Sequence, residues 1–150
     1  MSMAGVEGLI LSEWVVAALV GDAQMAAALG VVGPETVGAR VWEGIAPEGT
    51  PYPFVTFTVA EPQDWTGVGT TRVMSKVGLT VKATSRGRSY APIKAVAQRI
   101  DAALQGVLNV PTSGGGRVLS VIRQNGLQYP EQDGGEDYRH LGGVYEAHVQ

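Results

Sequence analysis

The chain has 150 residues and a formal net charge of −3, with 45% apolar residues, 17% charged residues and no cysteine. The length suits one domain over residues 1–150 with one core, and the missing cysteines exclude disulfides, thiolate zinc sites and cysteine nucleophiles. The charged fraction lies below the usual fraction of about a quarter, which indicates either a surface rich in Gly, Ala and Thr or a surface that partner subunits cover.

Charge is distributed unevenly along the chain. Residues 1–75 carry two basic and eight acidic side chains, whereas residues 76–150 carry nine basic and six acidic ones. All charged residues between Trp65 and Ile100 are basic: Arg72, Lys76, Lys82, Arg86, Arg88, Lys94 and Arg99. Four acids lie close together later in the chain: Glu131, Asp133, Glu136 and Asp137. Opposed charges of this kind suit contacts between copies of one chain, and they equally suit two ordinary solvated surfaces.

Residues 1–30 are predicted to form a helical N-terminal segment. Apolar side chains such as Ile10 and Trp14 recur at helical spacing, Asp22 can cap a second short helix, and Gly30 fits the left-handed position that ends it. No Lys or Arg precedes Arg40 and the apolar runs are short, so we expect neither a signal peptide nor a membrane span.

The predicted sheet begins near residue 40. Arg40–Trp42 is a short strand candidate, and three prolines in the following turn, Pro47, Pro51 and Pro53, exclude helix there. Phe54–Ala60 alternates apolar and polar residues, which predicts a second strand. The polar loop that follows, residues 61–71, is longer than a strand connection needs. Such a loop can reach a partner through Trp65, or Trp65 can fold back onto its own domain.

The chain is organised around a long strand and one helix. Residues 72–84 alternate between an apolar and a mostly polar face. A basic turn over residues 85–89 ends the strand, and an amphipathic helix follows, with its apolar stripe formed by Ile93, Val96, Ala97, Ile100, Ala103, Leu104 and Val107. The apolar face of the strand and the apolar stripe of the helix are expected to bury each other.

Two further strands complete the prediction, over residues 117–124 and 136–149, with a loop at 125–135. The fold class is therefore α+β: one mostly antiparallel sheet of about five strands, one long helix packed on a face, and short N-terminal helices. Residues 40–150 form the sheet-plus-helix core of this prediction.

Motifs for catalysis or metal binding are not found in the sequence. His140 and His148 share one face of a strand about 26 Å apart, too far for one metal ion, and no motif places a nucleophile near them. The glycine runs are followed by strands rather than by the helix of a phosphate loop, and the acids at 131–137 do not have calcium-loop spacing. We therefore predict no enzyme, no cofactor and no metal.

Two other interpretations stay open at this point. A monomeric α+β domain that binds a ligand or peptide would have an apolar pocket under the helix. An enzyme using Asp137 and His140 would have a deep cleft at the last strand.

Several segments resemble the tail completion family of long-tailed bacteriophages and related gene-transfer particles, also called tail terminator or head–tail joining proteins. In residues 40–55 a small strand and a Pro-Gly-x-Pro-aromatic-Pro-like turn lead into a strand. Residues 77–87 lead into a helix that ends at residues 100–104. Arg123 and residues 138–149 also fit, so the resemblance covers most of the chain, with residues 31–39 as a departure.

The resemblance implies a structural virion protein, assembled in the bacterial cytoplasm, that forms a ring, commonly of six copies, at the neck. The ring would cap the tail tube, stop its polymerisation and join it to the head connector, with DNA passing non-specifically through the lumen. The candidate interface residues are Trp65, Arg72, Lys76, Lys82, Arg86, Arg88, Glu131, Asp133, Glu136 and Asp137. The acids at 131–137 are expected to pair with Arg86 and Arg88 of the neighbouring subunit.

Overall fold

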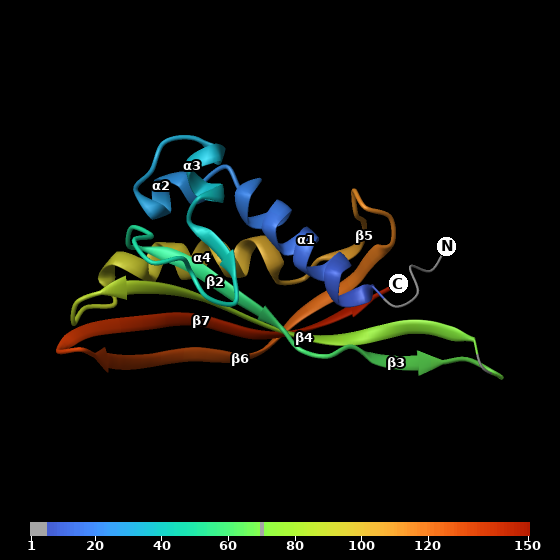
Figure 1. The fold of residues 1–150 in the computed structure, drawn as a ribbon. Coiled ribbons are helices and arrows are strands. Elements are labelled where there is room, and N and C mark those ends of the chain that lie inside the picture. The colour runs from blue at the N-terminus through green and yellow to red at the C-terminus, as the bar shows by residue number, and fades with distance from the viewer. Residues whose placement is uncertain (1–5, 70) are drawn as a thin grey trace.

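The computed structural model describes residues 6–69 and 71–150. Its elements are α1 (Glu7–Val20), α2 (Met25–Leu29), α3 (Pro34–Gly38), β1 (Val41–Glu43), β2 (Phe54–Val59), β3 (Gln63–Thr66), β4 (Arg72–Arg86), α4 (Ala91–Leu104), β5 (Leu108–Pro111), β6 (Arg117–Asp133) and β7 (Glu136–Val149). The helices lie on one face of a strongly twisted sheet, and the described residues place no helix on the opposite face (Figure 1). We call this second face the open face. Among the described residues, no helix combines the length and apolarity needed to cross a bilayer.

Strand β4 is the centre of the sheet. The strand order is β1-β2-β4-β7-β6-β5, and β3 pairs with β4 outside this path. One edge of β4 pairs first with β3 and then with β2, while its other edge pairs with β7 over residues 75–86. The β1–β2 pair is parallel and all other pairs are antiparallel. Strand β4 therefore pairs with three other strands.

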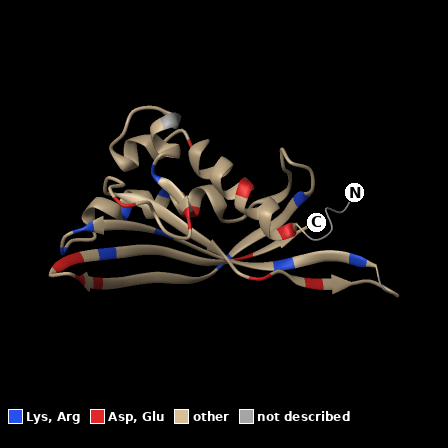
Figure 2. Cartoon of the chain, in the orientation of Figure 1, with Lys and Arg blue, Asp and Glu red and all other residues tan. Residues whose placement is uncertain are grey.

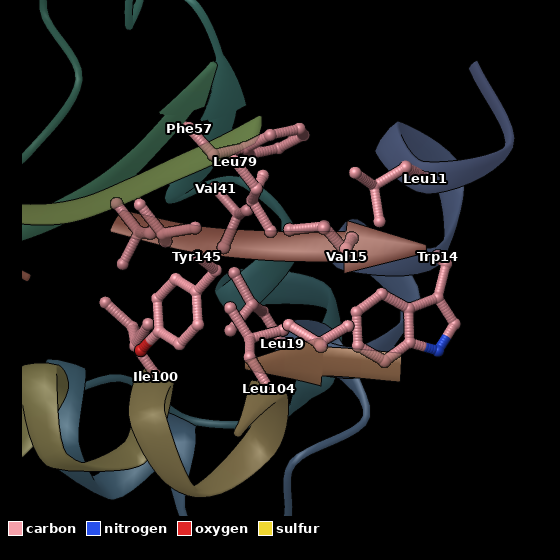
Figure 3. Close-up of a cluster of buried hydrophobic side chains, with 14 of the residues drawn as sticks. Leu11, Trp14, Val15, Leu19, Val41, Phe57, Leu79, Ile100, Leu104 and Tyr145 are labelled. Carbon is pink, nitrogen blue, oxygen red and sulfur yellow. The ribbon is translucent and has the colours of Figure 1, made fainter. Parts of the chain in front are cut away.

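The core fills the space between the sheet and the two long helices (Figure 3). Alternate residues of β4, such as Leu79 and Val81, are fully buried toward the helices. They belong to one buried cluster with Leu11 of α1, Ile100 of α4 and Tyr145 of β7. Burying one such aliphatic side chain contributes about 1.5–3 kcal/mol, so this cluster holds both helices on the same face. The predicted pairing of the long strand with the amphipathic helix is confirmed.

The α+β class is confirmed, but the predicted number of elements was wrong. The sheet has seven strands rather than about five, and α1 and α4 are equally long, with 14 residues each. The predicted loop at 61–71 contains β3, and the predicted loop at 125–135 is mostly the second half of β6. Both segments are polar and pair on one edge only, so they lack the apolar alternation from which strands are recognised. The parallel β1–β2 pair also makes the sheet mixed.

Gly142 allows β4 and β7 to approach each other closely. A Cβ atom at this position would overlap the carbonyl oxygen of Val81 and would lie 2.6 Å from the Cα of Lys82. Because both neighbours are backbone atoms, the two central strands would have to move apart.

We expect Gly142→Ala to lower the free energy of unfolding by at least about 1–3 kcal/mol, the usual cost of overpacking. Urea denaturation measures this change. Gly38→Ala is the matched control, since a Cβ there would have its nearest neighbour, a Val20 methyl, at 4.0 Å. Equal stability of the Gly142→Ala variant and the parent would contradict the close approach.

Candidate functional site

The hairpin of β3 and the start of β4, residues 63–69 and 71–76, projects beyond the helices, and we call it the arm (Figure 1). All four residues of β3 are exposed. Three large apolar side chains of the arm are exposed as well: Trp65 at 46%, Val68 at 104% and Val73 at 46%. The described residues leave about half of the Trp65 and Val73 side chains and all of Val68 uncovered. Exposed apolar groups gathered on one projection are typical of an interaction site.

Polar contacts fix the base of the arm to the domain. The Ser75 hydroxyl donates a hydrogen bond of 2.7 Å to Asp64, which ties the two strands together. Arg72 lies 3.4 Å from the carboxylates of both Asp64 and the buried Glu7 of α1. The Trp65 ring meets the His148 ring edge to face, with centroids 5.7 Å apart. The arm is therefore held in a defined direction, and Trp65 packs only partly on its own domain.

The other end of the sheet is the hairpin tip, where β6 turns into β7 at residues 134–135. There Arg86 contacts Glu136 at 2.7 Å and Arg88 contacts Asp137 at 2.8 Å, both within one chain. The hydrogen bond from Arg86 holds the pKa of Glu136 below its usual value. In the single chain these groups pair with each other, because β4 and β7 are neighbouring antiparallel strands whose ends place the charges side by side (Figure 2). Pairing across a subunit boundary stays a prediction.

A polar network lies on the open face near the hairpin tip. His140 is 5% exposed. Its Nδ1 is 3.0 Å from the Thr84 hydroxyl and its Nε2 is 3.0 Å from the Glu131 carboxylate. Its ring stacks on Tyr129, whose hydroxyl accepts a hydrogen bond from Lys82. The network borders a groove of about 360 Å³. His140 shares this face with His148, as predicted, and the neighbouring Tyr129 covers its ring.

Burial lowers the pKa of His140 and is the largest effect. The hydrogen bond to Glu131 raises the pKa by a smaller amount, and the positive charge of Lys82 lowers it further. The neutral ring is therefore favoured in the folded protein. The Asp137 carboxylate is bound to Arg88, so Asp137 and His140 have different partners. Within the described part of the chain, no three His, Asp or Glu side chains group as a metal site would require.

The ten candidate residues fall into three groups. Trp65, Arg72 and Lys76 belong to the arm; Lys82 and Glu131 belong to the open-face network; Arg86, Arg88, Asp133, Glu136 and Asp137 lie at the hairpin tip. Whether these residues contact another subunit stays a prediction. Sequence reasoning missed Val68 and Val73 as exposed apolar groups of the arm. The available signal was length: β4 spans about 50 Å, while α4 covers about 21 Å, so part of the strand must extend beyond the helix.

His140→Gln is expected to make stability less dependent on pH. The pKa of His140 is lower in the folded state than in the unfolded chain, where it is about 6.5. The unfolded state therefore binds more protons below pH 6.5, and the parent loses stability as the pH falls from there through the lowered pKa. Urea midpoints at about pH 7.5 and pH 5.5 should differ less for the variant.

His148→Gln is the control for this measurement, because His148 lies on the same face but is not fully buried. It removes an imidazole from the same strand without touching the hydrogen bonds that surround His140. A His140→Gln variant that loses as much stability as the parent between the two pH values would contradict the burial argument.

The chain matches two groups of known proteins. The family model described as tail completion protein gp17 matches residues 13–133. Among solved structures, a chain described as "Virion of native gene transfer agent (GTA) particle" superimposes with a TM-score of 0.66 at 20% identity, covering 99% of this chain and 98% of that one. No curated protein sequence matches the chain. The family match covers most of the sequence, including α4, the arm and all of β6. The chain belongs to the tail completion protein family, a family of structural virion proteins rather than of enzymes.

Proposed function

We propose that the protein forms a closed ring, with six copies as the expected number, at the junction of tail and head. The ring caps the end of the tail tube, stops its polymerisation and provides the surface on which the head connector docks. The observation that carries this proposal is the arm, whose exposed apolar side chains project from a member of the tail completion family.

The shape of the domain favours head-to-tail contacts. The arm and the hairpin tip lie at opposite ends of the sheet (Figure 1). When two different surfaces of one chain bind each other, the contacts repeat around a ring if the rotation closes. The charges of the tip are already paired within the chain, so the apolar arm rather than the charged tip is the stronger source of binding free energy.

The charge of the chain suits a passage for DNA. The formal net charge is −3, and an acidic wall lets a polyanion slide without being held. Contact with DNA would be non-specific, and the partners that bind tightly would be further copies of the chain, the tail tube protein and the connector protein. We place the assembly step in the cytoplasm of the host bacterium and the finished ring in the virion.

Val68→Asp is expected to abolish capping. Val68 is fully exposed at the end of the arm, so the substitution leaves the core untouched and puts a charge where apolar contact is needed. Tail tubes polymerised with the variant should grow to uncontrolled lengths, as they would without the protein. Negative-stain images give the tube lengths, and mass photometry of the capped ends gives the ring.

Val32→Asp is the matched control, because Val32 is 90% exposed in the helical layer away from the arm. This control should cap tubes as the parent does, and both variants should unfold at the parent's urea concentration. If Val68→Asp caps tubes as well as Val32→Asp does, the arm is not the capping surface. If the parent leaves tube lengths unchanged, the proposed function itself is wrong.

A further inference from the structure

The second half of β6 has a free edge. Strand β5 pairs with β6 only at residues 117–120, whereas β7 pairs along its whole length to Asp133. In the described part of the chain, no strand lies outside residues 124–133. A long strand edge with unpaired backbone groups is a template for pairing with another chain.

The hairpin turn defines which backbone groups of β6 point outward. The turn residues Gly134 and Gly135 both have positive φ, and Asp133 pairs with Glu136 across them. In a two-residue hairpin the two residues that close the turn exchange both backbone hydrogen bonds. Along the ladder, such hydrogen-bonded pairs alternate with pairs that form no backbone hydrogen bond to each other. Counting back in twos from Asp133, residues 131, 129 and 127 form hydrogen bonds with β7. The backbone groups of the residues between them, 126, 128, 130 and 132, therefore point away from β7.

Pro130 supports this assignment. Proline has no N–H to give to a ladder, and within sheets it occurs on edges with its nitrogen toward the free side. Residue 130 belongs to the outward set. The free edge therefore offers four carbonyl groups and the N–H groups of Gly126, Gln128 and Gln132 to an incoming strand.

The arm carries the second free edge. Strand β3 pairs with β4 on one side only, and its four residues are exposed. It lies on the opposite edge of the sheet from β6 and at the opposite end of the molecule (Figure 1). Two free edges placed in this way allow one copy to join the next without blocking its own second edge, which is the requirement for a closed ring.

Charges beside the two edges are complementary. On the helix side of β6, Lys94, Arg123 and Asp101 line a hollow of about 280 Å³. The Asp101 carboxylate already accepts a hydrogen bond from the Tyr145 hydroxyl, whereas neither Lys94 nor Arg123 forms an ion pair with a described side chain. Two acids lie at the arm: Glu61, two residues before it, and the half-exposed Asp64, whose carboxylate also contacts Arg72 and Ser75.

From these observations we infer that β3 of one copy adds to the free edge of β6 in the next copy, with the arm's carboxylates beside Lys94 and Arg123. The sheets of neighbouring copies then form one continuous sheet around the ring. This inference rests on the proposed ring and specifies the surfaces that close it. Strand β3 is short and Pro130 lacks an N–H group. Both features reduce non-specific pairing of these two edges with other strands.

Cysteine cross-linking tests the inference directly, because the chain contains no cysteine of its own. A variant with Gln63→Cys on β3 and Asn125→Cys on β6, two positions on the same face of the sheet, is assembled on tube ends and treated with a short bis-maleimide. Both positions are exposed. We expect a ladder of covalent species that ends at the ring size. Each single-cysteine variant should give none of the higher species.

The matched control pairs Gln63→Cys with Gln24→Cys, which is equally exposed but lies beside α2 in the helical layer. It should give no ladder. Rings seen by mass photometry without a 63–125 ladder, or with an equal ladder in the control, would overturn the edge assignment and leave the ring itself standing. Tube ends that carry no ring would contradict both the ring and the edge pairing.

Discussion

The difference in length between β4 and the helices that cover it determines the shape of this protein. A strand of 15 residues spans about 50 Å, and a helix of 14 residues spans about 21 Å. The helices bury the middle of the sheet, where Leu79 and Val81 are fully enclosed. The remaining strand length has to leave the domain, and it does so as the arm at one end and as the hairpin tip at the other (Figure 1).

The two ends differ in what they offer to a partner. At the tip, Arg86 and Arg88 already have their carboxylates within the chain, and exposed ion pairs of this kind add little to binding. The arm exposes apolar surface on Trp65 and Val68, whose burial is favourable in any contact that excludes water. The proposed binding free energy therefore comes from the arm and from strand edges, while charge contributes selectivity.

The middle of the fold could be predicted from the sequence because its periodicities are strong. The alternation from Arg72 onward and the stripe that includes Ile93 and Ile100 predicted β4, α4 and their mutual burial. The edges could not be predicted in this way, since Gln63–Thr66 and residues 125–133 are mostly polar and lack a regular apolar alternation. Each obtains its structure from one neighbouring strand. For the site, the charged residues at the tip were found, but whether they pair within or between chains depends on strand register, which no residue pattern here specifies.

The helices cover one face of the sheet, and the open face carries a network of polar side chains that hydrogen-bond one another. Thr84 and Glu131 each hydrogen-bond one ring nitrogen of His140, and Tyr129 stacks on its ring. This network is therefore more readily understood as a contribution to the stability of the domain than as a reactive site.

The central claim is that the arm and the free edges are surfaces of a ring. A cryo-electron microscopy map of assembled particles tests it most directly. The account predicts a closed ring of this chain at the end of the tail tube, with every arm in contact with a neighbouring copy or the tube. A map in which the chain is absent from that junction, or in which its arms extend freely into solvent, would contradict it.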